Sequence, residues 1–270
     1  MRESLRRFCK AVQCEFGPTY LRSPTESDMR ALLAHSESVG WPGMLGSIDC
    51  CHLAWKNCPK AWAGQYQGKS GEPTVVLEAV SDTRGRIWHC FFGMPGANND
   101  INVLDNSSLL FDAIHGTTPR VEFSVNGQTY DRPYWLADGI YPKYSVFVKI
   151  ISNPSTTKEA HFSKAQESRR KDVERMFGML QARWHSHESL PTLEQGCHEG
   201  CQMDQREVMA VPPSEWAINS PPPTRASGNV AHAERLRGAF ASVIDSTVHQ
   251  RLQNDLVEHQ WRIRLHNSEK

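Results

Sequence analysis

The sequence of 270 residues has no excess of charge of either sign and little apolar material. It contains 30 basic and 30 acidic residues, whereas a nucleic-acid-binding protein usually carries a basic excess. Apolar residues make up 39% of the chain and the mean hydropathy is −0.53, which predicts a folded core accompanied by polar or poorly ordered segments. No run of 18 or more apolar residues occurs, so we expect no membrane-spanning segment.

The N-terminus also lacks the apolar stretch of a secretory signal, which predicts an intracellular protein. In that compartment the eight cysteines are expected to be reduced thiols. Two groups of cysteine and histidine, at 50–58 and 197–201, each lack the second spaced pair that a structural zinc site normally has. We therefore expect these cysteines to be small buried or solvent-facing thiols.

The patterning of the chain changes three times along its length. We predict a helical N-terminal appendage at 1–40, a folded core at 41–184, a polar and disordered linker at 185–230, and a C-terminal helix at 231–270. Within the appendage, Gly17-Pro18 is predicted to end a first helix. Ser23 or Thr25 is predicted to cap a second one.

The core alternates strand patterns with helix patterns. We predict, in order, a strand at 43–50, two strands joined by a turn at 82–85, a helix at 98–116, a hairpin around Asn126-Gly127 whose last strand leads to Asp138, and a long helix that is capped by Ser163 and ends at Trp184. This order indicates an α/β fold that begins with an antiparallel hairpin. A ribonuclease H-like core, a mixed sheet flanked by helices, fits the order.

Three acidic residues lie where a site can form. Asp49 and Asp138 each close a short apolar run, and Glu174 lies on the long helix at the edge of its apolar stripe. Each also has an ordinary structural explanation. Asp49 can cap the next segment, Asp138 can form a turn with the glycine that follows it, and Glu174 can be a solvated helix residue.

Two carboxylates at strand ends and one on a helix suit the cleavage of phosphodiesters. That reaction needs an activated water or hydroxyl and neutralisation of the charge that builds on the phosphate. Two divalent ions roughly 3.5–4 Å apart supply both. Magnesium and manganese prefer oxygen ligands, so carboxylates suffice to hold them.

The long helix is also the most basic part of the chain. Its candidate phosphate contacts are Lys164, Arg169, Arg170, Lys171, Arg175 and Arg183. The alternative is a solvated helix face, as most charge runs are. Arg170 lies four residues before Glu174 and can pair with that carboxylate when no metal is bound.

Several strings in the core occur in the same order in a known family. They cover 43–69, 72–111, 134–144 and 171–184, and a further string covers 249–261. Characteristic pieces are GMLGSIDCCHLAW, YWLADGIYPKY and KDVERMFGMLQARW. The chain resembles the plant members of the PIF/Harbinger group of DDE transposases, which includes domesticated, Harbinger-derived nuclease-like proteins.

The resemblance implies a ribonuclease H-like catalytic core with a two-metal DDE site. The two aspartates of that site fall on Asp49 and Asp138, and the glutamate falls on Glu174. The implied cofactors are two magnesium or manganese ions, and the implied partners are DNA and a separate Myb-like DNA-binding protein. Action in the nucleus and strand transfer after cleavage are implied as well. Asp100 lies in a family-like block, and we interpret it as a structural residue at the start of a helix.

The chain departs from the family pattern at two places. Only about 40 residues precede the core, where relatives carry a longer N-terminal region, and the polar segment 185–230 replaces a helix with a Leu-His-Asn motif. Two main hypotheses therefore stand, and a third, an unrelated soluble α/β protein, applies only if the three acids lie far apart in the structure. The first is a transposase-derived, metal-dependent DNA endonuclease. The alternative is a catalytically inactive, domesticated or decayed transposase that acts as a nuclear protein- or DNA-binding factor.

Overall fold

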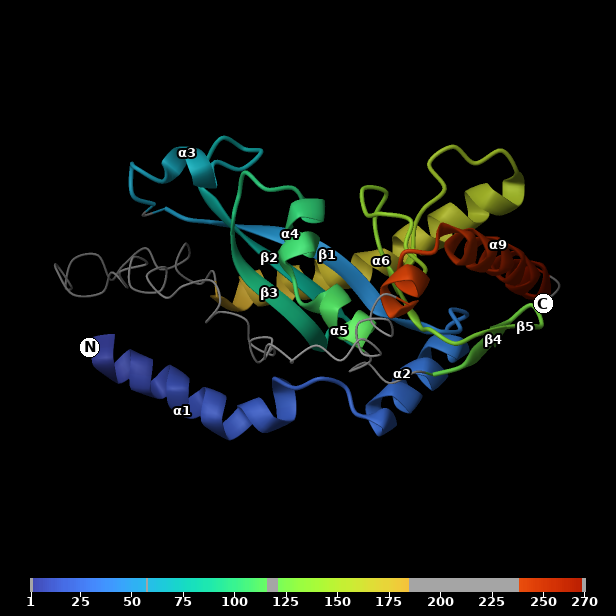
Figure 1. The fold of residues 1–270 in the computed structure, drawn as a ribbon, viewed down its shortest axis with the longest axis horizontal. Coiled ribbons are helices and arrows are strands. Elements are labelled where there is room, and N and C mark those ends of the chain that lie inside the picture. Colours follow the sequence, from blue (N-terminus) through green and yellow to red (C-terminus); the bar gives the residue numbers. More distant parts are fainter. Residues whose placement is uncertain (1, 57, 116–120, 185–237, 269–270) are drawn as a thin grey trace.

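A five-stranded mixed sheet flanked by helices forms the centre of the protein (Figure 1). The computed structural model describes residues 2–56, 58–115, 121–184 and 238–268. The strands of the main sheet are β1 (Met44–Ala54), β2 (Thr74–Ser81), β3 (Ile87–Pro95), β6 (Tyr134–Leu136) and β7 (Phe147–Val148). Their order across the sheet is β3-β2-β1-β6-β7. The predicted α/β class is therefore confirmed.

The first three strands form an antiparallel meander, and the last two run parallel to β1. The predicted turn between β2 and β3 is present, because the Gly85 N–H donates to the Asp82 carbonyl and Gly85 has φ of 79°. The connection from β1 to β2 is longer and contains the short helix α3 (Ala63–Tyr66). The parallel pairing of β1 with β6 brings segments about ninety residues apart in sequence into contact.

The single helix predicted at 98–116 is wrong, because the structure has two helices there. They are α4 (Asp100–Asn106) and α5 (Leu109–His115). Ser107 separates them with an extended ψ of 150°, and its hydroxyl accepts a hydrogen bond from the Leu109 N–H at 3.2 Å. A serine that bonds locally to the backbone competes with helix continuation. The predicted end at Gly116 lies outside the described residues.

The hairpin predicted around Asn126-Gly127 is confirmed, but its strands belong to a separate sheet. β4 (Phe123–Val125) and β5 (Gln128–Tyr130) pair only with each other, and both turn residues have positive φ, 53° and 80°. The segment that leads to Asp138 is a further strand, β6, in the main sheet. The prediction merged β5 and β6 because only three residues separate them.

The long helix α6 spans Thr157–Trp184, so the predicted start at Ser163 is wrong. Glu159 accepts hydrogen bonds from the Ser155 and Thr156 N–H groups at 2.6 and 3.2 Å, and the Thr156 hydroxyl accepts one from the Glu159 N–H at 3.2 Å. This reciprocal pattern is a capping box. Ser163 lies inside the helix and its hydroxyl bonds to the backbone of Ile151 at 3.1 and 3.2 Å.

Two helices precede the sheet. α1 (Arg2–Tyr20) continues through Gly17-Pro18, so the predicted break is wrong. Pro18 lies in the last turn, where its missing N–H removes one bond and the chain still closes a turn from the Leu21 N–H to the Gly17 carbonyl at 2.8 Å. Thr25 caps the N-terminus of α2 (Glu26–Ser38), which confirms one of the two predicted caps.

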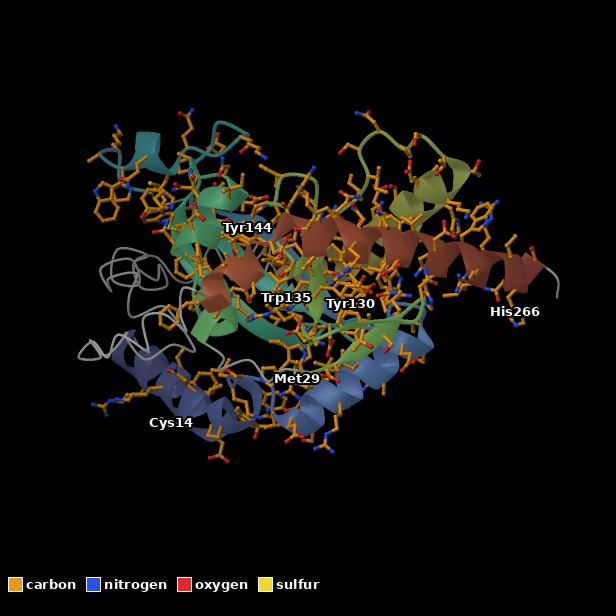
Figure 2. The ribbon with its side chains drawn as sticks, turned by 45° about the vertical axis from the view of Figure 1, so that its right-hand side comes forward. Cys14, Met29, Tyr130, Trp135, Tyr144 and His266 are labelled. Atoms are coloured by element: carbon orange, nitrogen blue, oxygen red, sulfur yellow. The ribbon has the colours of Figure 1, made fainter. Side chains whose placement is uncertain are left out.

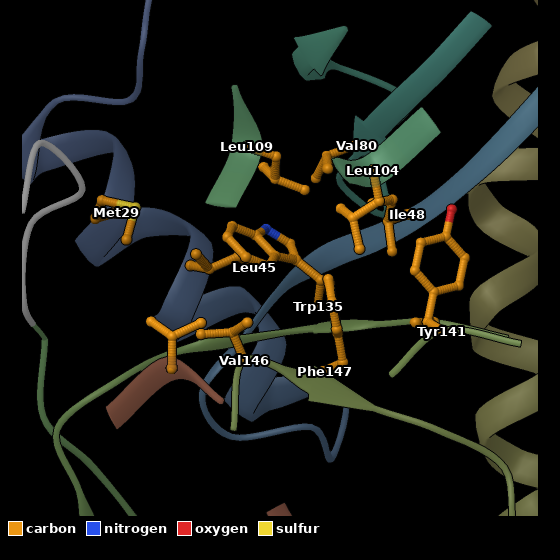
Figure 3. Packing of buried hydrophobic residues seen from close by; sticks show 12 residues of the cluster. Met29, Leu45, Ile48, Val80, Leu104, Leu109, Trp135, Tyr141, Val146 and Phe147 are labelled. Atoms are coloured by element: carbon orange, nitrogen blue, oxygen red, sulfur yellow. The ribbon is translucent and has the colours of Figure 1, made fainter. Parts of the chain in front are cut away.

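Three apolar clusters pack the layers together. On one face of the sheet Ile48, Val80 and Trp135 pack against Met29 of α2 and against α4 and α5 (Figure 3). On the other face, near β2, Val173 and Phe177 of α6 pack on Leu77 and Ala79. Because successive residues of a strand point to opposite faces, Asp49 shares the α6 face with Ala79, its partner in the register.

The C-terminal helix α9 (Ser246–Ser268) packs beside α6 (Figure 2). Leu252 and Leu256 are buried in the third cluster with Phe162, Trp41 and Leu136. The C-terminal helix predicted at 231–270 is interrupted at 244–245, between a helical stretch at 238–243 and α9, because the Asp245 carboxylate accepts from the Thr247 and Val248 N–H groups and caps α9. Residues 231–237 and the predicted linker at 185–230 lie outside the described residues. No helix in the described part of the chain is long and apolar enough to cross a bilayer.

Candidate active site

Asp49 is the sixth of the eleven residues of β1, so its predicted place at a strand end is wrong. The strand continues because it pairs with β2 as far as Ala54. The Asp49 side chain is 16% exposed and accepts a hydrogen bond from the Cys50 N–H at 2.9 Å. It does not cap a following segment. Its carboxylate lies on the α6 face in the interior of the sheet.

Asp138 follows the end of β6, as predicted, with only Ala137 between the strand and the acid. Ser47 of β1 pairs with Leu136 of β6 in a parallel register, and Asp49 and Asp138 each lie two residues further along. Side chains two residues apart share a face, and neighbouring strands lie about 4.8 Å apart. The two aspartates therefore lie at neighbouring positions, Asp49 within β1 and Asp138 just past the end of β6, and the charge of Asp138 acts on Asp49.

Asp138 also forms a turn with the residues that follow it, which is the ordinary structural role that the sequence suggested for it. The Ile140 N–H donates to the Asp138 carboxylate at 2.8 Å. This bond uses one oxygen of the carboxylate. A role in the turn and a role in a site are therefore compatible for Asp138.

One arginine, Arg170, connects Glu174 to Asp49. Arg170 donates a hydrogen bond from one terminal nitrogen to Asp49 at 2.9 Å, and its other terminal nitrogen forms an ion pair with Glu174 at 2.7 Å. The pairing with Glu174 was predicted, and the pairing with Asp49 was not. Arg170 is 15% exposed and Glu174 is 43% exposed, so the bridge connects the largely buried Asp49 to an exposed carboxylate.

The carboxylates at this site affect one another. Burial raises the pKa of Asp49 to about 6, Arg170 opposes that shift, and the charges of Asp100 and Asp138 add to it. Among the residues that the structure describes, no three histidine, cysteine, aspartate or glutamate side chains are close enough together to hold a metal ion. The cation that two of the three acids share is the guanidinium of Arg170.

Asp100 is the residue whose relation to the site the sequence did not reveal. It begins α4 directly after the cap Asn99, which confirms its predicted position at a helix start. Burial, and next the charge of Asp138, raise the pKa of Asp100, while Lys69 and His52 lower it. The acidic residue in the GANNDINVLD block was a signal from which a position near the site could have been predicted. Its proximity to Asp138 depends on the packing of α4 against the sheet.

Lys149 is a second residue near the site that the sequence did not indicate. It follows β7 and donates a hydrogen bond to the Tyr141 carbonyl. Burial and Lys143 lower the pKa of Lys149, and Asp138 raises it. A half-buried cation therefore stands close enough to Asp138 for the charge of that carboxylate to act on it.

The six basic residues predicted to contact phosphate differ in their surroundings. Arg170 is bound to the two acids, and Arg169 and Arg175 both pair with Asp172. Lys171 lies 3.8 Å from Glu167 and is exposed, as are Lys164, Arg175 and Arg183. Most of the predicted set is thus available on the surface of α6, which leaves its contact with DNA a prediction.

The fold and the site define a mixed α/β protein with one acid on β1, one just past the end of the parallel strand β6, and one on the helix that covers the sheet. A family model described as "Plant transposon protein" matches residues 18–193. Because this span covers more than half of the chain, the protein belongs to the plant transposon protein family. The match includes all three predicted acids.

Curated proteins from mammals are similar over shorter stretches, and each is named "Putative nuclease HARBI1". The protein from Rattus norvegicus is 35% identical over 71 residues, 26% of this chain and 20% of that protein. The one from Mus musculus is 25% identical over 146 residues, 54% of this chain and 38% of that protein. The one from Homo sapiens is 33% identical over 92 residues, 33% of this chain and 26% of that protein.

The chain therefore spans less than two fifths of the length of each of these relatives. No solved structure matches it. The comparisons place the chain in a transposase-derived family whose mammalian relatives carry the name of a nuclease.

Proposed function

We propose that the protein is a transposase-derived, metal-dependent DNA endonuclease that cleaves phosphodiester bonds by a two-metal DDE mechanism. The observation that carries the proposal is the pairing of β1 with β6, because it brings Asp138, just past the end of β6, close enough to Asp49 for their charges to interact. Glu174 of α6 shares a guanidinium with Asp49. Membership of a transposase-derived family supports the assignment.

The strand order also supports a ribonuclease H-like core. An antiparallel meander, a later strand that leads to Asp138 and a long helix follow the predicted order, and the structure adds β7 and the parallel pairing of the last two strands. In such a mixed sheet the first strand is central, so a carboxylate on β1 is held by neighbours on both sides. This placement suits a ligand that must keep its position when charge develops nearby.

The donor set fits divalent metal ions that prefer oxygen. Asp49, Asp138 and Glu174 offer hard carboxylate oxygens, and two of them already neutralise one positive charge, the guanidinium of Arg170. When bound, two magnesium or manganese ions would activate the attacking water and neutralise charge on the phosphate. Asp49 and Asp138 would hold them from the sheet, and Glu174 would close the site from the helix.

DNA is the proposed substrate, and the nucleus is the proposed place of action. The exposed basic residues of α6 lie on the helix that carries Glu174, so a phosphate backbone bound along the helix would pass the acids. Such contacts are independent of base sequence and weaken with salt. A separate Myb-like protein would supply recognition of sequence, and strand transfer would follow cleavage.

The test is cleavage of supercoiled plasmid DNA by the full chain with magnesium or manganese. We expect Asp49→Asn and Asp138→Asn each to reduce the rate at least about 100-fold, because each removes charge that would hold the ions. Asp105→Asn, a change at an exposed position on α4, should leave the rate within about twofold of the wild-type value. Cleavage that is unchanged in both site variants would refute the assignment.

A further inference from the structure

The guanidinium of Arg170 lies between two acids that come from different elements. It contacts Asp49 of β1 at 2.9 Å and Glu174 of α6 at 2.7 Å, through different nitrogens. We propose that Arg170 is an internal counter-ion of the metal-free site, which competes with divalent ions for these two carboxylates and must leave them before an ion binds. This inference rests on the proposed function and adds a control step to it.

The surroundings of the bridge explain why a counter-ion is needed. Asp49 and Arg170 are 16% and 15% exposed, so the carboxylate has little contact with water. A poorly hydrated carboxylate next to further acids requires a neutralising partner. The charges of Asp100 and Asp138 act on the same group. Arg170 supplies the positive charge that the ions would otherwise supply.

Contacts other than those of Arg170 also hold α6 on the sheet. The apolar side chains Val173 and Phe177 are buried against Leu77 and Ala79 of β2. Gln166 donates to two backbone carbonyls at the other end of the contact, at 2.9 and 3.0 Å. Removal of the guanidinium should therefore leave the helix in place and the carboxylates without a counter-ion.

Arg169 provides a matched control on the same helix. It pairs with Asp172 at 3.4 Å and is 30% exposed. Arg169→Gln and Arg170→Gln remove the same charge at consecutive positions. Only the second change removes a partner of the proposed metal ligands.

The experiment is a calorimetric titration of the full chain with Mn²⁺ in the absence of DNA. If Arg170 occupies the site for about nine tenths of the time, Arg170→Gln should bind Mn²⁺ about tenfold more tightly than the wild-type protein. Arg169→Gln should bind with wild-type affinity. Arg170→Lys keeps the charge without the two-pronged geometry, so its affinity should fall between the two.

The outcomes separate this inference from the proposed function. Wild-type or weaker Mn²⁺ affinity in Arg170→Gln, with binding still lost in Asp49→Asn, would overturn the counter-ion role and leave the metal site intact. Equal Mn²⁺ binding by the wild-type protein and Asp49→Asn would overturn the proposed metal site itself.

A second measurement needs no substitution at Arg170. An ion that takes over the carboxylates releases the guanidinium, so labelling of wild-type Arg170 by phenylglyoxal should rise severalfold when Mg²⁺ is added. The reactivity of Arg169 should stay constant, which makes it an internal reference. Unchanged labelling of Arg170 at saturating Mg²⁺ would contradict displacement.

Discussion

At the scale of single residues, His249 connects the C-terminal helix to the sheet. Its Nδ1 lies 2.9 Å from the Phe147 carbonyl and 3.1 Å from the Tyr144 carbonyl, and the residue is 2% exposed. Because both partners are acceptors, Nδ1 carries the proton and donates. The neutral ring satisfies this geometry, and burial lowers the pKa of His249 below its ordinary value of 6.5.

The lowered pKa predicts a loss of stability in mild acid. Below pH 6.5 the unfolded chain takes up a proton at His249 before the folded protein does. The contribution of His249 to the free energy of unfolding therefore has its full value above pH 6.5. It decreases as the pH falls toward the pKa of the folded protein. The raised pKa values of Asp49 and Asp100 act in the opposite direction, so the decrease should be seen in the stability difference between the wild-type protein and a His249 variant, measured by urea unfolding at pH 8, 7, 6 and 5.5.

The contribution of His249 is isolated by His249→Asn, which keeps a donor and removes the titrating group. Burial lowers the pKa values of His52, His161 and His259 too, so part of the decrease should remain in the variant. A pH dependence identical to that of the wild-type protein would show that His249 does not contribute.

At the scale of elements, Gln166 holds α6 against the ends of two strands. Its side-chain amide donates to the Ala137 carbonyl at 2.9 Å and to the Val148 carbonyl at 3.0 Å, and the residue is completely buried. Ala137 immediately precedes Asp138. The bond therefore fixes the position of the helix that carries Glu174 relative to the strand that leads to Asp138.

We expect Gln166→Leu to lower the free energy of unfolding by about 1–3 kcal/mol. The substitution keeps a similar volume but removes both donated bonds and leaves the buried Ala137 carbonyl without that partner. Gln250→Leu on α9 is the control, since Gln250 is exposed and bonds only to Asn254 among the contacts described. Equal stability of the two variants in urea would contradict a role for Gln166 in docking.

Local sequence signals predicted the centres of elements better than their boundaries. Thr25 and the Asn126-Gly127 turn were correct because each depends on bonds within a few residues. Ser163 was wrong as a cap because its hydroxyl bonds to Ile151, a contact twelve residues away. The hydrophobic spacing continues through Ser107 as it would in a single helix. The helix is nevertheless divided there, because the Ser107 hydroxyl bonds to Leu109 and to His89 of β3.

At the scale of the whole molecule, the two terminal helices differ in how they are attached. Large apolar side chains of α1 are exposed, including Phe8 at 65% and Phe16 at 53%. Its described hydrogen bond to the rest of the fold runs from Arg86 to the Thr19 carbonyl at 3.1 Å. α9 instead buries Leu252 and Leu256, at 1% and 0% exposure, against α6 and the sheet.

Deleting the two helices should therefore have opposite results. Without residues 1–20 the free energy of unfolding should change by less than about 1 kcal/mol, since little apolar surface is uncovered. Without residues 246–268 the buried side chains of α9 lose about 1.5–3 kcal/mol each, which together approaches the stability of a typical domain. Cooperative thermal unfolding should then be lost.

Circular dichroism melts of the two deletion variants check this prediction. A cooperative transition that survives the removal of α9, or disappears with the removal of α1, would contradict the assignment of α9 to the core. The family match, which begins at residue 18, agrees with the peripheral position of α1 (Figure 1).

The sequence by itself determined the family, the α/β class and the three acids to examine, because these depend on residue identity and on periodicity along the chain. It could not determine that Asp49 lies in the interior of a strand, since the continuation of β1 depends on its pairing with β2. Only the tertiary structure brought Arg170 to Asp49, across 121 positions of sequence. Contacts between distant segments are set by the packing of a helix on a sheet, which no local pattern encodes.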